Sequence, residues 1–142
     1  MTSRRRSEMS NQDIKVTFGD GLVVKAECRG HLITTDQPLA AGGGDSAPTP
    51  FELFLTSIAT CAGFYVLAFL KQRQLSTEGI YLTMSTERSP ESRLVKNIKL
   101  EIHLPESFPD KYREAVAKAA DQCTVKAHLE QPPSIEIRAI KN

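Results

Sequence analysis

Cysteine is scarce in this sequence of 142 residues, and its distribution excludes two kinds of site. The three cysteines are an odd number and contain no Cys-x-x-Cys pair, so they do not form a disulfide framework. No two of the cysteines and histidines have the spacing of metal ligands, which argues against a metal site. We therefore expect a protein of a reducing compartment, the cytoplasm, that uses no metal or other cofactor.

An excess of charge of one sign is also missing. The net charge is +1, and the basic residues are scattered except near the N-terminus. This balance argues against nucleic acid or an anionic membrane surface as the main partner. The first ten residues, MTSRRRSEMS, lack the apolar stretch of a secretory signal. We interpret residues 1–12 as a flexible basic tail and residues 13–142 as one domain.

The glycine-rich segment from Asp36 to Thr49, DQPLAAGGGDSAPT, has the composition of a loop. It lacks the Gly-Lys-Ser/Thr that completes a phosphate cradle, so a loop packed near a site is the better interpretation.

One long apolar run follows this loop. The stretch from Phe51 to Leu70 contains a single charge, Glu52, and is long enough to cross a bilayer. Polar and small residues dilute it, and alternating sequence surrounds it, so we predict a helix buried in a soluble protein without a membrane partner. Thr49 at the N-cap, Pro50 next and Glu52 third predict a capping box at its start.

Alternating apolar residues predict strands, and the order of elements predicts the fold class. Strands are expected at 14–18, 22–29, 31–35, 80–85, 98–104 and 134–140, with helices at 110–123 and from about 123 to 131. Neighbouring strands and grouped helices indicate an α+β fold. One sheet face and one modest helix cannot cover a long helix that is apolar on nearly all sides. We therefore predict a homodimer built around that helix.

Each cysteine has a structural interpretation of its own. Cys28 is the fourth apolar position of a strand and is expected in the core. Cys61 lies in mid-helix, too far from the start of its helix to be activated by the dipole, and alone it too reads as a core residue. Cys123 lies at a junction between helices. If it begins the second one, unpaired N–H groups there favour its thiolate, and a structural role stays equally open.

Two motifs together resemble the OsmC-like family of hydroperoxide-detoxifying proteins. Pro50-Phe51-Glu52-Leu53 matches the Pro-x-Glu-Leu helix start of that family, and Cys61 follows the glutamate by nine residues. Cys123-Thr124-Val125 matches its Cys-x-Val motif, and the loop that precedes the helix is similar to the loop of one branch. The order of elements agrees from about residue 14 to 140.

The resemblance implies a fold and a mechanism. Members form an intertwined homodimer with the long helices central and antiparallel sheets wrapped outside. Cys61 would attack the peroxide and become a sulfenic acid, and Cys123 would resolve it as a disulfide that an external dithiol reduces. Glu52 and an arginine of the other subunit would lie near the reactive thiol, where the arginine supplies positive charge.

The sequence departs from this pattern at the arginine. The family carries it shortly before the long helix, in the region of residues 37–41, but no arginine occurs here between Gly30 and Cys61. Arg29 is the nearest replacement, although it lies earlier, on a predicted strand. Lys126, three residues after Cys123, is another cation that could serve.

These observations lead to one functional hypothesis and two alternatives. We expect a thiol-dependent reductase of organic hydroperoxides whose site residues are Cys61, Cys123, Glu52 and Arg29. The alternatives on the same fold are a non-catalytic protein that binds a small ligand and a redox sensor that forms the disulfide without turnover. The aromatic residues of the long helix suit two roles equally well, which are to surround the apolar tail of a hydroperoxide or to fill the core: Phe51, Phe54, Phe64 and Tyr65.

Overall fold

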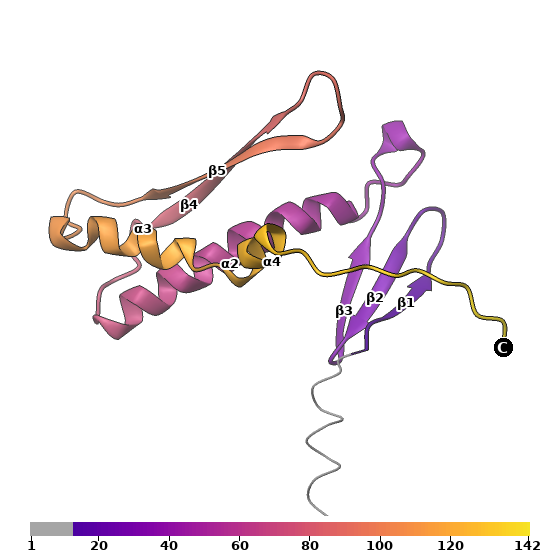
Figure 1. Cartoon of the computed structure of the whole chain (residues 1–142), viewed down its shortest axis with the longest axis horizontal. Helices are drawn as coiled ribbons and strands as arrows, with labels where there is room; N and C mark the ends of the chain where they lie inside the picture. The colour runs from indigo at the N-terminus through magenta and orange to yellow at the C-terminus, as the bar shows by residue number, and fades with distance from the viewer. Residues whose placement is uncertain (1–12) are drawn as a thin grey trace, which may run out of the picture. The chain divides into compact units, whose positions relative to one another are not determined.

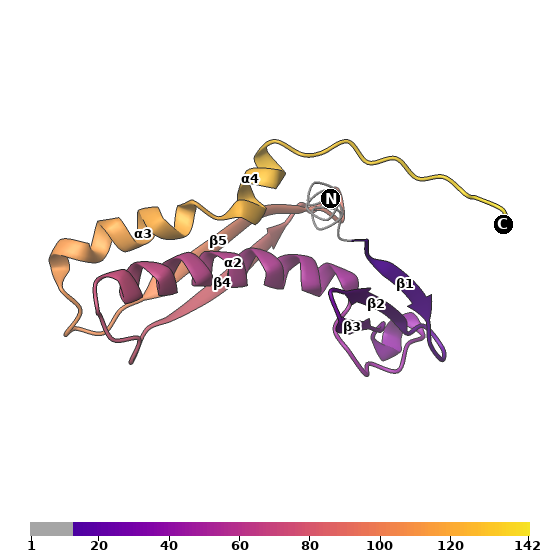
Figure 2. The same ribbon diagram turned by 90° about the horizontal axis from the view of Figure 1, so that it is seen from below.

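The structure is a computed structural model that describes residues 13–142, so the prediction of a basic tail lies outside the described residues. Contacts divide the chain into two compact units, one ending at Phe54 and the other beginning at Leu55. The boundary falls within the long helix α2 (Pro50–Gln72). Figures 1 and 2 show the elements of each unit from two directions.

The first unit contains a three-stranded antiparallel sheet in the order β1-β2-β3 (Figure 1). Its strands are β1 (Lys15–Phe18), β2 (Val24–Cys28) and β3 (His31–Thr35). Val16 pairs with Ala26, and Ala26 pairs with Ile33, so the apolar positions share one face as the alternation predicts. Cys28, expected in the core of this face, is only half-buried.

Arg29 does not lie on a strand, in contrast to the prediction. Cys28 pairs with His31, so Arg29 and Gly30 form the two-residue turn between β2 and β3. Both residues have positive φ, 52° at Arg29 and 81° at Gly30. A two-residue hairpin requires such angles because they match the twist of the flanking strands. The strand therefore stops one residue before Arg29.

The loop after β3 is organised by the buried side chain of Asp36, which is 2% exposed. Its carboxylate accepts hydrogen bonds from the Ser46 hydroxyl and from the backbone N–H groups of Gln37, Gly44 and Ser46. The Ser46 hydroxyl contributes most to holding the pKa of Asp36 below its ordinary value, and these N–H groups add to the effect. A loop that directs its N–H groups at its own carboxylate is not arranged to cradle a phosphate. The interpretation of the segment as a loop is therefore confirmed, with a short 3-10 helix, η1 (Leu39–Ala41), inside it.

Helix α2 begins with the predicted capping box. The backbone N–H of Thr49 donates to Glu52 Oε2 at 2.7 Å, and the backbone N–H of Glu52 donates to Thr49 Oγ1 at 3.2 Å. This reciprocal pair satisfies N–H groups that have no partner within the helix.

The second unit packs a hairpin and two helices against the rest of α2. The hairpin consists of β4 (Tyr81–Arg88) and β5 (Val95–His103), and η2 (Asp110–Tyr112) leads into α3 (Arg113–Asp121). Both views show α3 running beside α2, and α4 (Thr124–Glu130) follows it. The core between these elements is formed by five buried residues: Val66, Phe69, Leu70, Phe108 and Val116.

By length and composition α2 could cross a membrane, with a mean hydropathy of 2.0 in its most apolar stretch. The core helix of a folded protein meets the same criterion, and α2 contributes Val66, Phe69 and Leu70 to the core. Only 28% of that stretch is buried, and Phe64 is 60% exposed. Within this chain, part of the apolar surface of α2 is therefore uncovered.

The strand predicted at 134–140 is not formed. The described chain has neither helix nor strand after Gln131, and Ile135, Ile137 and Ile140 are 81%, 92% and 72% exposed. An alternating sequence becomes a strand only where a neighbouring backbone supplies hydrogen bonds, and among the described residues no backbone group is hydrogen-bonded to this segment.

Gly43 lies where a side chain does not fit. A Cβ atom at this position would lie 2.0 Å from the carbonyl oxygen of Gln37. We expect Gly43→Ala to lower the free energy of unfolding by about 1 to 3 kcal/mol, because the backbone has to move. Urea unfolding measures this change. Gly44→Ala is the matched control, since its Cβ would meet an Asp36 side-chain oxygen at 3.2 Å and should cost less. Equal losses in the two variants would contradict this account.

Candidate functional site

The second unit brings together two cysteines that lie far apart in the sequence. Cys61 is on α2 and Cys123 precedes α4, and the two thiols lie close enough for each to shift the pKa of the other. Cys123 is 3% exposed, whereas Cys61 is half-buried. The start of α4 is therefore folded against the middle of α2.

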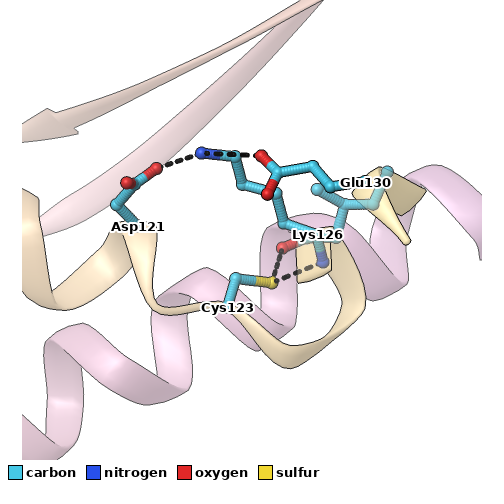
Figure 3. Close-up of polar contacts among 5 residues, drawn as sticks. Asp121, Cys123, Lys126 and Glu130 are labelled. Carbon is cyan, nitrogen blue, oxygen red and sulfur yellow. Dashed lines mark hydrogen bonds and ion pairs between the residues drawn. The ribbon is translucent and has the colours of Figure 1, made fainter. Parts of the chain in front are cut away.

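Cys123 is the N-cap residue of α4. Its sulfur accepts a hydrogen bond from the backbone N–H of Lys126 at 3.5 Å (Figure 3). Its thiol donates to the carbonyl oxygen of Ile58 at 3.9 Å, one turn before Cys61 on α2. A sulfur atom thus takes the place of the usual capping oxygen and joins the two helices.

The surroundings shift the pKa values of the two thiols in opposite directions. Burial raises the pKa of Cys61, but hydrogen bonds from the Val125 N–H, the Cys123 thiol and the Thr124 N–H hold it below the ordinary 9.0. Burial raises the pKa of Cys123 above 9.0, and its contact with Cys61 raises it further. Cys61 is therefore the thiol that ionises first, and the nucleophile of a thiol reaction is the thiolate.

This result corrects the expectation for Cys123. Cys123 does begin the second helix, but its own thiolate is not favoured because burial outweighs the N–H groups around it. The N–H groups of Thr124 and Val125 instead lower the pKa of Cys61. Cys61 is distant from the start of its own helix, and the start of α4 supplies the donors.

Lys126 does not direct its charge at the sulfur atoms. Figure 3 shows its ammonium between the carboxylates of Asp121 and Glu130, with which it forms ion pairs. The hydrogen bond to Asp121 contributes most to a raised pKa of Lys126. The contact of Lys126 with Cys123 is made by its backbone N–H.

Glu52 and Arg29, the other two predicted site residues, belong to the first unit. Glu52 is engaged in the capping box with Thr49, and Arg29 is exposed in the β2–β3 turn. The structure thus brings together two of the four predicted residues, the two thiols.

A cavity of about 490 Å³ opens beside Cys123 within the second unit. Its walls are mostly aliphatic and come from α2, β4, β5, α3 and α4, with Arg113, Asp121, Cys123 and Lys126 as polar groups. Phe64 and Tyr65, which the sequence suggested as lining for an apolar tail, do not line it. Residues of β5 have this role instead: Ile98, Leu100 and Ile102.

Sequence reasoning missed one further pair of polar residues. The Tyr65 hydroxyl and Thr124 Oγ1 lie 2.9 Å apart and form a hydrogen bond between α2 and α4. Tyr65 follows Cys61 by one helical turn, and Thr124 follows Cys123 directly, so the sequence shows that each residue lies near a cysteine. The sequence does not show that Tyr65 and Thr124 contact each other. Among residues 13–142, no cluster of three or more His, Cys, Asp or Glu residues is arranged to hold a metal ion.

Comparison with known proteins gives concordant matches. A family model described as OsmC-like protein matches residues 42–138. Protein YhfA of Escherichia coli K12 is 29% identical over 128 residues, which cover 85% of this chain and 91% of YhfA.

Solved structures show the same fold. The OsmC like protein of Mycoplasma pneumoniae has a TM-score of 0.64 at 18% identity, covering 86% of this chain and 89% of that one. An organic hydroperoxide resistance protein OsmC of Legionella pneumophila has a TM-score of 0.53 at 23% identity, covering 84% and 88%. The predicted α+β fold, with antiparallel sheets and a long helix, is confirmed by these likenesses.

The opposite pKa shifts predict an order of reaction with electrophiles. In the reduced protein at pH 7, we expect iodoacetamide to modify Cys61 before Cys123, because Cys61 holds more thiolate and is less buried. Peptide mass mapping after short exposures measures both rates. Cys123→Ala, which removes one hydrogen bond to Cys61, should slow the modification of Cys61. Faster labelling of Cys123 in the parent protein would overturn the assignment.

Proposed function

The chain belongs to the OsmC-like protein family, and on this premise we propose that it reduces organic hydroperoxides through the thiol of Cys61. The observation that carries the proposal is the contact of two thiols whose pKa values are shifted apart, with Cys61 the more acidic. The Legionella relative is named an organic hydroperoxide resistance protein, which agrees with this class of substrate.

The reaction consists of two steps at the cysteines. The Cys61 thiolate attacks the distal oxygen of the hydroperoxide, the O–O bond breaks, and the alkoxide leaves and takes a proton from solvent. Cys61 is then a sulfenic acid. The Cys123 sulfur attacks the Cys61 sulfur, hydroxide leaves with the Cys123 proton as water, and a disulfide forms. An external dithiol reduces this disulfide and is itself oxidised, which restores both thiols.

The two thiols suit these roles for different reasons. Cys61 is the better nucleophile at neutral pH, because backbone N–H groups of α4 stabilise its thiolate in place of a cation on the same chain. Cys123 has a raised pKa and lies against Cys61, so it stays a thiol while the Cys61 thiolate attacks the hydroperoxide. We retain Glu52 and Arg29 in the proposal as residues that a second subunit supplies near Cys61.

The cavity beside Cys123 supports both this proposal and the main alternative. Its aliphatic walls and volume of about 490 Å³ suit the organic group of a hydroperoxide. The same walls suit a small apolar ligand that is bound without reaction. A non-catalytic binding protein therefore remains the second candidate, and the fate of the thiols distinguishes the two.

We also propose that the protein is a cytoplasmic homodimer. Phe64 and Leu67 of α2 are 60% and 39% exposed in this chain. The C-terminal residues 134–140 alternate like a strand and have exposed isoleucines at Ile135 and Ile137. Single chains rarely leave so much apolar surface in water, and a second copy would cover both regions.

Oxidation of the reduced protein tests the peroxidase. We expect cumene hydroperoxide to remove two free thiols and to produce a peptide linked through Cys61 and Cys123. Cys61→Ser should abolish the reaction, and Cys123→Ser should stop it at the sulfenic acid, detected by a sulfenic-acid-specific label. Thiol titration and mass spectrometry give these results, and Cys28→Ser is the matched control that should react normally.

Three other outcomes discriminate among the candidates. Two thiols that stay free in excess hydroperoxide would refute the peroxidase and favour the binding protein. A disulfide that forms once, without turnover when dithiothreitol is supplied, would favour the redox sensor. Sustained loss of hydroperoxide with the dithiol supports the enzyme.

Light scattering during gel filtration tests the dimer. We expect the mass of two chains, and we expect Ile135→Lys with Ile137→Lys to shift the protein toward one chain, because both side chains would be covered in the dimer. Glu136→Lys with Arg138→Glu, at the positions that alternate with these isoleucines, is the control and should weaken the dimer less. A single-chain mass for the parent protein would contradict the proposal.

A further inference from the structure

Helix α4 carries the groups that act on Cys61, yet little of it is buried. It has seven residues, Thr124–Glu130, and none of them is fully buried. Its start contacts α2 through the Cys123 thiol and through one side-chain pair, the Tyr65 hydroxyl and Thr124 Oγ1 at 2.9 Å. A short helix with so little buried surface needs such contacts to hold a fixed position.

The two residues of this pair are placed next to the two thiols. Tyr65 lies four residues after Cys61 on α2, so both side chains emerge from the same face of the helix. Thr124 directly follows Cys123 and is the first residue of α4. The hydrogen bond between Tyr65 and Thr124 therefore joins α2 to the start of α4. The N–H groups of this same turn, those of Thr124 and Val125, act on Cys61.

We propose that Tyr65 is a positioning residue which, through its hydrogen bond to Thr124, holds the Cys123–Val125 turn against the Cys61 sulfur. The phenol acts through Thr124, and its loss lets the turn move away from Cys61, so that the hydrogen bonds from the Thr124 and Val125 N–H groups to the Cys61 sulfur lengthen. The inference rests on the proposed function only in taking Cys61 as the reacting thiol.

Ionisable groups near this turn come from α2, α3 and α4. From α2 they are Cys61 and the Tyr65 phenol. From the α3–α4 segment they are Arg113 of the cavity wall, Cys123, the Lys126 ammonium with its carboxylates Asp121 and Glu130, and His128. The His128 ring lies 2.7 Å from the carbonyl oxygen of Thr124, and the ammonium of Lys126 lies between its two carboxylates. The change in the titration of Cys61 described below is therefore also measured in a variant that lacks the His128 ring.

The test is the pH dependence of Cys61 alkylation in the full, reduced chain. We expect Tyr65→Phe and Thr124→Val each to raise the apparent pKa of Cys61 by roughly half a unit to one unit, the range set by one lost hydrogen bond. At pH 7 the rate of iodoacetamide modification should fall by about three- to tenfold. Mass mapping assigns the rate to Cys61, and His128→Asn excludes histidine as the titrating group.

Matched variants separate positioning from general damage to the fold. Thr124→Ser keeps the hydroxyl and should keep the pH profile of the parent. Tyr81→Phe, an exposed tyrosine of β4, is the control for the loss of a phenol and should leave the profile unchanged. The double variant Tyr65→Phe with Thr124→Val should show no larger shift than either single variant, because both remove the same bond.

The results have distinct meanings. Overlapping profiles for Tyr65→Phe and the parent, or additive shifts in the double variant, would overturn the inference. Because alkylation needs no peroxide, a shifted profile in a protein that fails to reduce cumene hydroperoxide would support the positioning role and refute the proposed enzyme. An unshifted profile in an active peroxidase would do the reverse.

Discussion

The contact between the Cys61 and Cys123 thiols is the constraint on which the candidate site depends. It requires the chain to return to the middle of α2 after the β4–β5 hairpin and α3, and the buried side chains of Phe69, Leu70 and Val116 make that return possible. Once the elements are packed, the start of α4 has to lie on α2. The sulfur of Cys123 then serves as the helix cap, and its single S–H proton can go either to the Ile58 carbonyl oxygen or to the Cys61 sulfur.

The same location has opposite electrostatic consequences for the two sulfur atoms. Burial disfavours the charged form of both. For Cys61 the backbone N–H groups of Thr124 and Val125 and the Cys123 thiol outweigh burial, whereas Cys123 is more deeply buried and lies beside the developing charge of Cys61. The two thiols therefore differ in acidity, although they are chemically identical groups. This difference bears on the missing arginine, because neutral N–H donors of the backbone can favour a thiolate without a cation.

Local features of the fold could be predicted from the sequence because their causes are local. The capping box needs only Thr49 and Glu52 at the right spacing, and both hydrogen bonds are present. The long helix follows from its continuous apolar run and its capping box, and the strands of the β4–β5 hairpin follow from the alternation of their apolar residues. The prediction for residues 134–140 was wrong, because alternation describes the surface of a strand and does not supply its neighbour. Arg29 was misplaced for a related reason, since the two-residue turn is set by the pairing of Cys28 with His31.

The sequence alone determined the candidate residues, namely two cysteines in recognisable motifs and a glutamate that caps the start of a long apolar helix. The type, order and spacing of side chains are written in the chain. The tertiary structure decided which thiol is acidic, that Lys126 offers its backbone rather than its charge, and that aliphatic residues of β5 line the cavity. A pKa and a contact depend on distances between segments that are remote in sequence, and only the packed chain sets those distances.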